Sequence, residues 1–317
     1  MTLSVVLMAL MLGAVAGVPG PATGTLAGLP GSKHSQKLQA IVDDAVRAAI
    51  AEFSAPALDT SQVAVTLVDV SKPACEWAST RGQAPVYPAS VVKLFYLVAA
   101  HDALESQRLK DSEEFQRALR DMIVDSSNDA TSYVLDLLTG TTSGPELDSL
   151  ALADWADQRN AVNRLFAARG YSGINCNKKP WGDGPYGRET QASRAFAPGR
   201  NLLTSDATAR LLSEIATGRA CTKARCQQML DVLARDPQRP SDDPDDQGRG
   251  FSGSALSAGM KLWSKAGWTS RVRHDAACIQ LKDGRRFVLV TFTEGHGDER
   301  GIVPAIARSV VRALVQP

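Results

Sequence analysis

The order of strand and helix patterns along the 317-residue chain limits its fold more than any other feature. Strand patterns occur near both ends, in five segments: 62–70, 76–80, 260–268, 273–281 and 287–293. Helical periodicity covers 35–53 and 303–314, and most of the chain between 90 and 234 is helical in pattern. The pattern predicts an α+β fold. One antiparallel sheet, built from the N- and C-terminal strands, is flanked by the terminal helices, and an all-helical lobe is inserted between them.

This order also predicts the division of the chain. We place one domain at 35–317, with an α/β lobe formed by 35–86 and 254–317 and a mainly helical lobe formed by 87–253. Active sites often lie where two such lobes meet, so we expect a functional site at this boundary.

The first residues read as a targeting segment. Leu3 to Val18 is an apolar run that ends in Ala14-Val15-Ala16, and no charge follows until Lys33. We assign 1–22 as signal peptide and leader, which predicts an exported protein, periplasmic or extracellular, with no stable membrane insertion of the mature domain. No Lys or Arg precedes the run, so an uncleaved tether is the alternative.

Charge and cysteine content limit the partners. A formal net charge of +1, without a basic cluster, gives no electrostatic argument for nucleic acid and leaves a small molecule as the expected partner. We expect a monomer. Export would permit oxidation of some of the five cysteines, although an odd number leaves at least one unpaired: Cys75, Cys176, Cys221, Cys226 and Cys278. Only His274 lies near a cysteine, so the sequence predicts no metal and no cofactor.

A serine and a lysine, Ser90 and Lys93, stand three residues apart at the start of an apolar run. One helical turn places both side chains on one face. Burial lowers the pKa of a lysine until its amine can accept a proton, which would make the serine a nucleophile without a histidine. Composition alone produces such a pair about once in a chain of this length, and a solvated helix lysine is the alternative.

Ser126-Ser127-Asn128 begins a second helix after an apolar stretch. A serine here can relay a proton to a leaving nitrogen, and an asparagine side chain offers both a donor and an acceptor to a substrate amide. The same residue types are favoured as helix N-caps, which is the structural alternative.

A third motif, Lys265-Ala266-Gly267, falls inside a predicted strand. Glycine within a strand often marks the close approach of a ligand or another backbone. The lysine beside it can bind a carboxylate. An edge lysine that discourages aggregation is the alternative.

In this order, the three motifs resemble those of the penicillin-recognising serine acyltransferases, which include class A β-lactamases and penicillin-binding proteins. The resemblance extends from about residue 62 to the C-terminus. Two further residues resemble class A enzymes. Arg273 opens the strand after Lys265, where an arginine often pairs with the substrate carboxylate. Glu189 lies in a long loop, about where that class places the glutamate that activates the deacylating water.

The resemblance implies a role for each residue. Ser90 would be the nucleophile and Lys93 its base or proton relay, a role that Glu189 could share. Ser126 would protonate the leaving nitrogen. The backbone N–H groups of Ser90 and Trp268 would form the oxyanion hole.

The same resemblance implies a substrate-binding side. Asn128 would hold the amide of the substrate side chain, and Lys265 with Arg273 would bind its carboxylate. The chain departs from the family at Ala266, which replaces a threonine or serine, and at Trp268, which shares the face of Ala266 where a small residue is usual. Substrate binding would thus involve residues 265–268 together with Asn128 and Arg273.

The segment after Glu189 departs from the family pattern. Glu189 is followed by Thr190-Gln191-Ala192-Ser193 in place of the family's E-x-x-L-N ending, so the asparagine that holds the water becomes Ser193. An ordinary exposed loop glutamate is the alternative.

The resemblance implies a serine hydrolase, acylated on Ser90 by a β-lactam or another cyclic amide and then deacylated by water. Two alternatives stay open. One is a peptidase, transpeptidase or esterase acting on cell-wall peptides or small esters. The other is a penicillin-binding sensor that is acylated without turnover.

Overall fold

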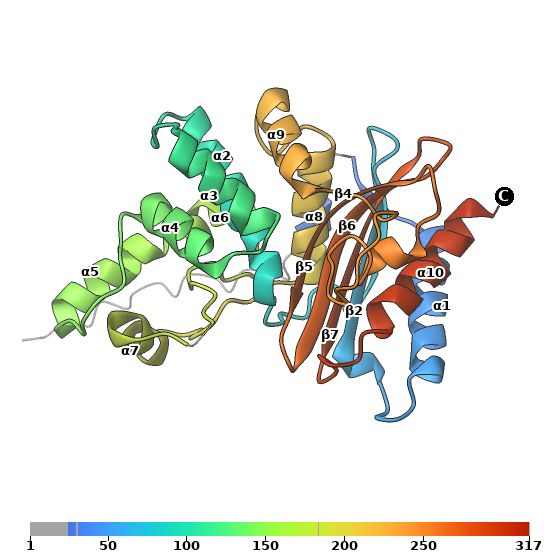
Figure 1. Ribbon diagram of the computed structural model, residues 1–317, viewed down its shortest axis with the longest axis horizontal. Helices are drawn as coiled ribbons and strands as arrows, with labels where there is room; N and C mark the ends of the chain where they lie inside the picture. Colours follow the sequence, from blue (N-terminus) through green and yellow to red (C-terminus); the bar gives the residue numbers. More distant parts are fainter. Residues whose placement is uncertain (1–24, 30, 183, 317) are drawn as a thin grey trace, which may run out of the picture.

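The computed structural model describes residues 25–29, 31–182 and 184–316 (Figure 1). The signal peptide and leader predicted at 1–22 lie outside the described residues. Across the described part, no helix is both long and apolar enough to cross a membrane. All five cysteines are free thiols in this structure.

A seven-stranded sheet forms the centre of the α/β lobe, with the strand order β1-β3-β2-β7-β6-β5-β4. The five predicted strands are present: β2 (Val63–Asp69), β3 (Glu76–Thr80), β5 (Lys261–Trp268), β6 (Val272–Gln280) and β7 (Arg286–Glu294). Each of these pairs antiparallel with its neighbours among the five. Two short strands, β1 (Lys33–His34) and β4 (Ala234–Arg235), complete the edges. A strand of two residues is too short to show a periodic pattern, so the sequence did not predict β1 or β4.

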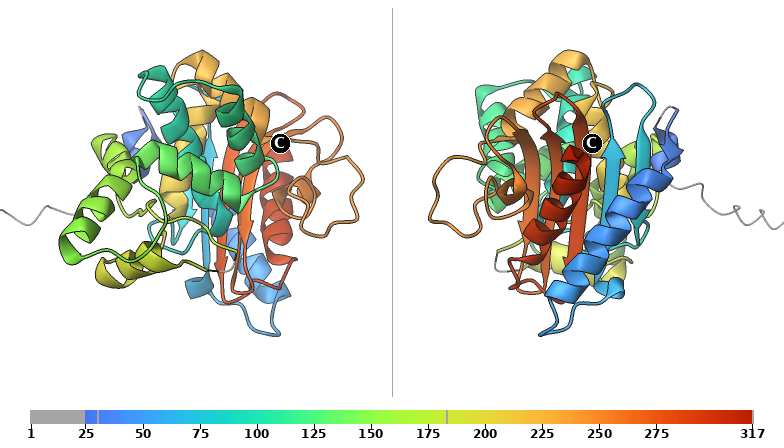
Figure 2. Two further views of the ribbon diagram at one scale, coloured as in Figure 1. Left: turned by 60° about the vertical axis from the view of Figure 1, so that its left-hand side comes forward. Right: turned by 90° about the vertical axis from the view of Figure 1, so that its right-hand side faces the viewer.

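Helices cover both faces of the sheet. The terminal helices α1 (Gln36–Glu52) and α10 (Ile302–Val315) lie side by side on one face, as Figure 2 shows. The opposite face is covered by α8 (Ser205–Ala216), which packs on β2, β6 and β7 (Figure 1). The fold is therefore the α+β arrangement that the sequence predicted.

β2 is buried on both faces of the sheet. Val65 and Thr66 face opposite sides, and both are fully buried. Thr66 faces α8 instead of water, and its hydroxyl donates to Asp206 Oδ1 over 2.8 Å. A hydrogen-bonded polar residue can thus alternate with apolar ones inside a core.

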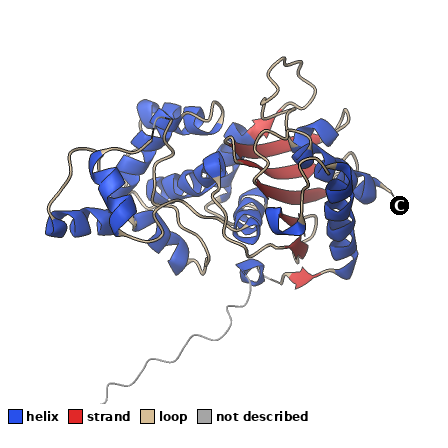
Figure 3. Ribbon diagram, turned by 90° about the horizontal axis from the view of Figure 1, so that it is seen from below, coloured by secondary structure: helices blue, strands red, loops and turns tan. Residues whose placement is uncertain are grey.

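The remaining α-helices form the second lobe (Figures 1 and 3). They are α2 (Lys93–Glu105), α3 (Glu113–Ile123), α4 (Asn128–Thr139), α5 (Ser149–Arg159), α6 (Ala161–Ala168), α7 (Gly187–Ala195) and α9 (Lys223–Leu233). Gly140, at a φ of 65°, ends α4 in the left-handed conformation that glycine adopts without strain. The motifs around Ser90 and Ser126 belong to this lobe, whereas Lys265 belongs to the sheet, so the site lies between the lobes.

Candidate active site

Ser90 lies in a short 3-10 helix, Ala89–Val92, which continues directly into α2 at Lys93. The backbone N–H of Lys93 donates to the carbonyl of Ser90, so a single turn separates the two residues. Ala89 has a φ of 45°, an uncommon conformation for a residue with a side chain. Such strain is concentrated at functional sites, where the surrounding structure maintains it.

Lys93 is fully buried, and its amine makes three hydrogen bonds to the Ser126 loop. Nζ donates to Ser126 O over 2.5 Å, to Ser126 Oγ over 3.1 Å and to Asn128 Oδ1 over 2.9 Å. Burial lowers the pKa of Lys93 to about 7. The solvated-lysine alternative is therefore wrong, and the amine can be neutral near neutral pH.

Ser126, Ser127 and Asn128, at the start of α4, make two different kinds of contact. Ser127 is the N-cap, and its hydroxyl accepts a hydrogen bond from the N–H of Ala130. Ser126, at a φ of 57°, and Asn128 instead contact Lys93. Helix capping thus accounts for Ser127 but not for the two residues to which the sequence assigned chemistry.

Lys265 lies within β5, which is paired on both sides, by β4 and by β6. Its side chain is fully buried, so the edge-lysine alternative is wrong. Nζ donates to Gln247 Oε1 over 2.7 Å and to Ala266 O over 2.8 Å. Burial, followed by the positive charges of Lys93 and Arg235, holds the pKa of Lys265 well below its ordinary value.

Gly267 brings this strand against the serine. A Cβ atom on Gly267 would lie 2.6 Å from the backbone nitrogen of Ser90 and 2.8 Å from the carbonyl oxygen of Pro88. No side chain fits in that space. The close backbone approach predicted from a glycine within a strand is therefore present, and the partner is the nucleophile segment itself.

Arg273 lies on β6 directly opposite Trp268 on β5. Its guanidinium is buried, with Nη1 2.8 Å from Asp245 Oδ1 and Nη2 donating to Gly250 O over 3.3 Å. It also stacks on the ring of Phe251. The arginine is thus at the end of the predicted site, but a carboxylate of the same chain already pairs with it.

Ala266 and Trp268 have different surroundings. Ala266 is buried against Phe251 and Val303. Trp268 is 36% exposed, and its ring centroid lies 5.5 Å from that of Phe251. An aromatic pair therefore flanks the strand end beyond Gly267.

Glu189 lies in the first turn of α7, and only 2% of its surface is exposed. The exposed-glutamate alternative is therefore wrong. Its Oε1 accepts hydrogen bonds from Arg159 Nη2 and Ser143 Oγ, both over 2.9 Å, and lies 3.8 Å from Lys179 Nζ. Among the described residues, Glu189 makes no ion pair with Lys93. Its cationic partners are Arg159 and Lys179.

Ser193, which the sequence placed where the family has an asparagine, does not face the Glu189 carboxylate. Its hydroxyl donates to the backbone carbonyl of Glu189, one turn earlier in α7. Glu189 and Ser193 both line a cavity of about 310 Å³, together with Tyr87 and Asn201. This cavity leaves space for water beside the carboxylate.

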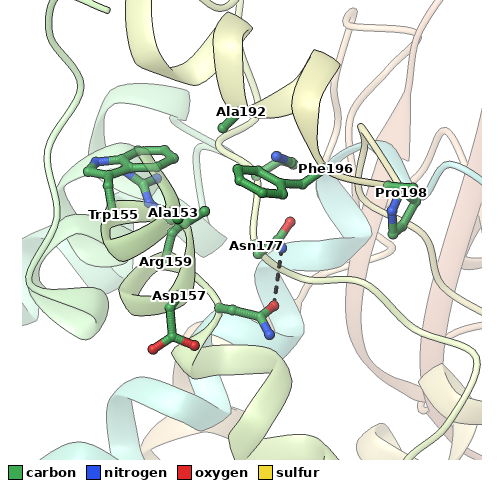
Figure 4. A pocket seen from close by; sticks show the side chains of 12 residues that line it. Ala153, Trp155, Asp157, Arg159, Asn177, Ala192, Phe196 and Pro198 are labelled. Carbon is green, nitrogen blue, oxygen red and sulfur yellow. Dashed lines mark hydrogen bonds between the residues drawn. The ribbon is translucent and has the colours of Figure 1, made fainter. Parts of the chain in front are cut away.

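Arg159, the main partner of Glu189, also borders a second pocket, of about 250 Å³, shown in Figure 4. Trp155 stacks on its guanidinium at 4.7 Å, and Phe196 lies across the pocket. Nη2 of Arg159 also binds Asp136 Oδ1 over 3.0 Å. The ion pair of Glu189 is therefore part of a larger buried network that fixes α7 against α4 and α5.

His274 and Gln247 also contact the candidate site, and the sequence assigned no chemical role to either. The N–H of Thr293 donates to His274 Nδ1, which leaves Nε2–H to donate to the carbonyl of Tyr87 over 2.8 Å. Burial lowers the pKa of His274 to about 4, so the ring is neutral and ties β6 to the segment before Ser90. Gln247 lies in a loop and contacts Lys265, and nothing in its local sequence signals this.

Comparisons with known proteins identify the family of this chain. Residues 45–316 match the family described as the beta-lactamase enzyme family. None of the curated proteins matches the chain.

Solved structures with the same fold include a β-lactamase from Sphaerobacter thermophilus, at 20% identity and a TM-score of 0.62, covering 88% of this chain and 99% of that one. A β-lactamase from Chitinophaga pinensis is 17% identical, with a TM-score of 0.61 and coverage of 88% and 98%. PBP-A is 16% identical, with a TM-score of 0.60 and coverage of 90% and 98%. The family match spans most of the chain and these structures share its fold, so the chain belongs to the β-lactamase enzyme family.

Proposed function

We propose that this protein is an exported serine hydrolase whose Ser90 is acylated by a β-lactam amide and released by water. The observation that carries the proposal is the environment of Lys93. A buried amine with a pKa of about 7 lies one turn from Ser90 and is bonded to Ser126 and Asn128. Such an amine can accept the proton of a serine at neutral pH.

Acylation would proceed in balanced steps. Ser90 Oγ attacks the amide carbonyl, its proton passes to Lys93, and the oxyanion forms against the backbone N–H groups of Ser90 and Trp268. The C–N bond then breaks, and Ser126 transfers a proton to the leaving nitrogen, with Lys93 replacing the proton on Ser126. The product is an ester on Ser90. The 3.1 Å contact between Lys93 Nζ and Ser126 Oγ supports this relay.

Substrate binding would use the residues around this centre. Asn128 would bind the amide of the substrate side chain, through a side chain that now contacts Lys93. Lys265 and Arg273 would bind a substrate carboxylate, and Trp268 would contribute an exposed aromatic wall. The proposed substrate is a small molecule, a β-lactam or a cell-wall peptide, and the proposed active form is a monomer.

Deacylation would need a base, for which we propose Glu189. Its Oε1 is occupied by Arg159 and Ser143, whereas Oε2 makes no hydrogen bond to the described residues. The adjoining cavity of about 310 Å³ can admit water. A water held by Oε2 would hydrolyse the ester.

The ion pair of Glu189 favours one alternative, a penicillin-binding protein without turnover. Arg159 and Ser143 both donate to Oε1 of Glu189, which leaves only Oε2 to hold a deacylating water. The sensor alternative would then show acylation without release.

A time course with a chromogenic β-lactam distinguishes these functions. Colour and intact mass are followed for wild type, Ser90→Ala and Glu189→Gln. The proposal predicts catalytic colour in wild type, neither colour nor adduct in Ser90→Ala, and a persistent adduct in Glu189→Gln. A persistent adduct in wild type itself supports the sensor, and cleavage of small esters alone supports an esterase. Colour unchanged in Ser90→Ala would refute the mechanism.

A further inference from the structure

The loop between β4 and β5 projects from the side of the molecule (orange in Figure 2), and two of its side chains return to β5 and β6. It carries four aspartates within 242–246, followed by Gln247. Asp245 and Gln247 contact the two basic side chains that a substrate carboxylate would use, Arg273 and Lys265. Nothing in the acidic sequence of this loop signals these inward contacts.

Gln247 binds the strand at the lysine. Its Oε1 accepts hydrogen bonds from Lys265 Nζ over 2.7 Å and from the backbone N–H of Ala266 over 3.2 Å. Its Nε2 donates to the carbonyl of Val124 over 3.0 Å, two residues before Ser126. One side chain therefore bridges the two lobes across the end of the cleft.

Asp245 binds the arginine in the same way. Its Oδ1 lies 2.8 Å from Arg273 Nη1 and 3.0 Å from Arg300 Nε, and its Oδ2 lies 3.0 Å from Arg300 Nη2. The hydrogen bond from Arg300 and, after it, that from Arg273 lower the pKa of Asp245, so it is a carboxylate. The carboxylate of Asp245 is therefore bound to the same guanidinium, that of Arg273, which would bind the carboxylate of a substrate.

Arg273 and Lys265 differ in the charge of the groups that bind them. Arg273 has an anionic partner, whereas the oxygens that accept from Lys265 are an amide and a backbone carbonyl, both neutral. Among the described residues, Lys265 makes no ion pair. A buried amine with only neutral acceptors gains most from an anionic ligand, and Gln247 occupies the position that such a ligand would take.

We propose that Gln247 and Asp245 are specificity-determining residues that occupy the carboxylate-binding end of the cleft. Substrates without a carboxylate at that end are accepted as the loop stands, whereas an anionic substrate must displace both side chains. This inference rests on the proposed function for the identity of the substrate class. Space for the displaced amide exists, because Gln247 lines a cavity of about 600 Å³ that also borders Val124 and Trp268.

The experiment compares a cephalosporin acid with its methyl ester, which differ only in the charge at this end. Binding is measured by calorimetry in a Ser90→Ala background, so the readout does not require acylation. Gln247→Ala and Asp245→Asn are each expected to tighten binding of the acid by about tenfold and to leave the ester unchanged. Gln247→Glu, which places an anion on Lys265, is expected to weaken binding of the acid.

Two residues of the same loop provide matched controls. Gln238 bonds to Leu256 O and not to Lys265, and Asp242 is exposed. Gln238→Ala and Asp242→Asn should leave the ratio of acid to ester affinity at the wild-type value. Each variant is first shown to unfold cooperatively at a melting temperature near that of wild type.

An unchanged ratio in both Gln247→Ala and Asp245→Asn, with Gln247→Glu also without effect, overturns the proposal. A ratio that changes equally in Asp242→Asn also overturns it, because overall loop charge would then explain the result. The outcome is separable from the proposed function. Failure of Ser90 to form an acyl-enzyme with either compound refutes that function, while a shifted binding ratio still supports the role of the loop.

Discussion

Lys93 makes the acylation of Ser90 dependent on pH. With a pKa of about 7, the amine is only about 1% neutral at pH 5, so acylation there should be roughly a hundredfold slower than at a plateau above pH 8.5. The two histidines with lowered pKa values, His101 and His274, have pKa values of about 4 and do not titrate in this window. The rate should therefore rise along a single titration curve.

The assay is stopped-flow acylation by a chromogenic β-lactam between pH 5 and 9, with the adduct confirmed by intact mass. Lys93→Arg keeps a cation that does not deprotonate, so it should lose both the rate and the inflection. Lys110→Arg, at an exposed lysine, should preserve the wild-type profile. A rate independent of pH from 5 to 9, or a Lys93→Arg variant that retains the inflection, would refute the assignment of Lys93 as base.

Three further predictions follow from the packing around the site. Gly267→Ala places a methyl group 2.6 Å from the Ser90 nitrogen, so it should lower the free energy of unfolding by about 1 to 3 kcal/mol and slow acylation. Urea unfolding and adduct formation measure the two effects, and full acylation with unchanged stability would contradict the contact. His274 is neutral when folded, with its pKa lowered from 6.5 to about 4, so the unfolded chain binds the extra proton. Stability should therefore fall by up to about 3 kcal/mol as the pH decreases from 6.5 to 4, and should fall less in His274→Gln; equal pH dependence in both proteins would count against this. Asn128→Ala removes one acceptor from Lys93, so it should lower the pKa of acylation as well as the rate, and an unshifted pH profile would argue against that coupling.

Much of the fold followed from local signals. Ser112 and Thr204 are residue types favoured as N-caps, and both accept hydrogen bonds from the backbone at the starts of α3 and α8. The chain between 147 and 169 forms two helices, α5 and α6, which meet at Asn160. The long loop predicted around Glu189 contains α7. Its polar sequence gave little periodicity, and its stability comes from the buried contacts of Glu189.

The contacts within the candidate site could be expected from sequence where the residues lie close together in the chain. Ser90 with Lys93, and Ser126 with Asn128, are short motifs on helix starts, and the structure joins them through Lys93. The contacts of Gln247 and Asp245 with β5 and β6 depend on how a long loop returns to the sheet, which no local pattern encodes. The partner of Glu189 was equally hidden, because Arg159 lies 30 residues away.

The central claim is that Ser90 forms the acyl-enzyme. Its most direct test is proteolytic mapping of the adduct after brief exposure of wild type and Ser90→Ala to a β-lactam at pH 8.5. The account predicts that the added mass of one opened β-lactam lies on the peptide containing Ser90 in wild type, and that Ser90→Ala carries none. An adduct on any other residue, or one that persists in Ser90→Ala, would contradict it.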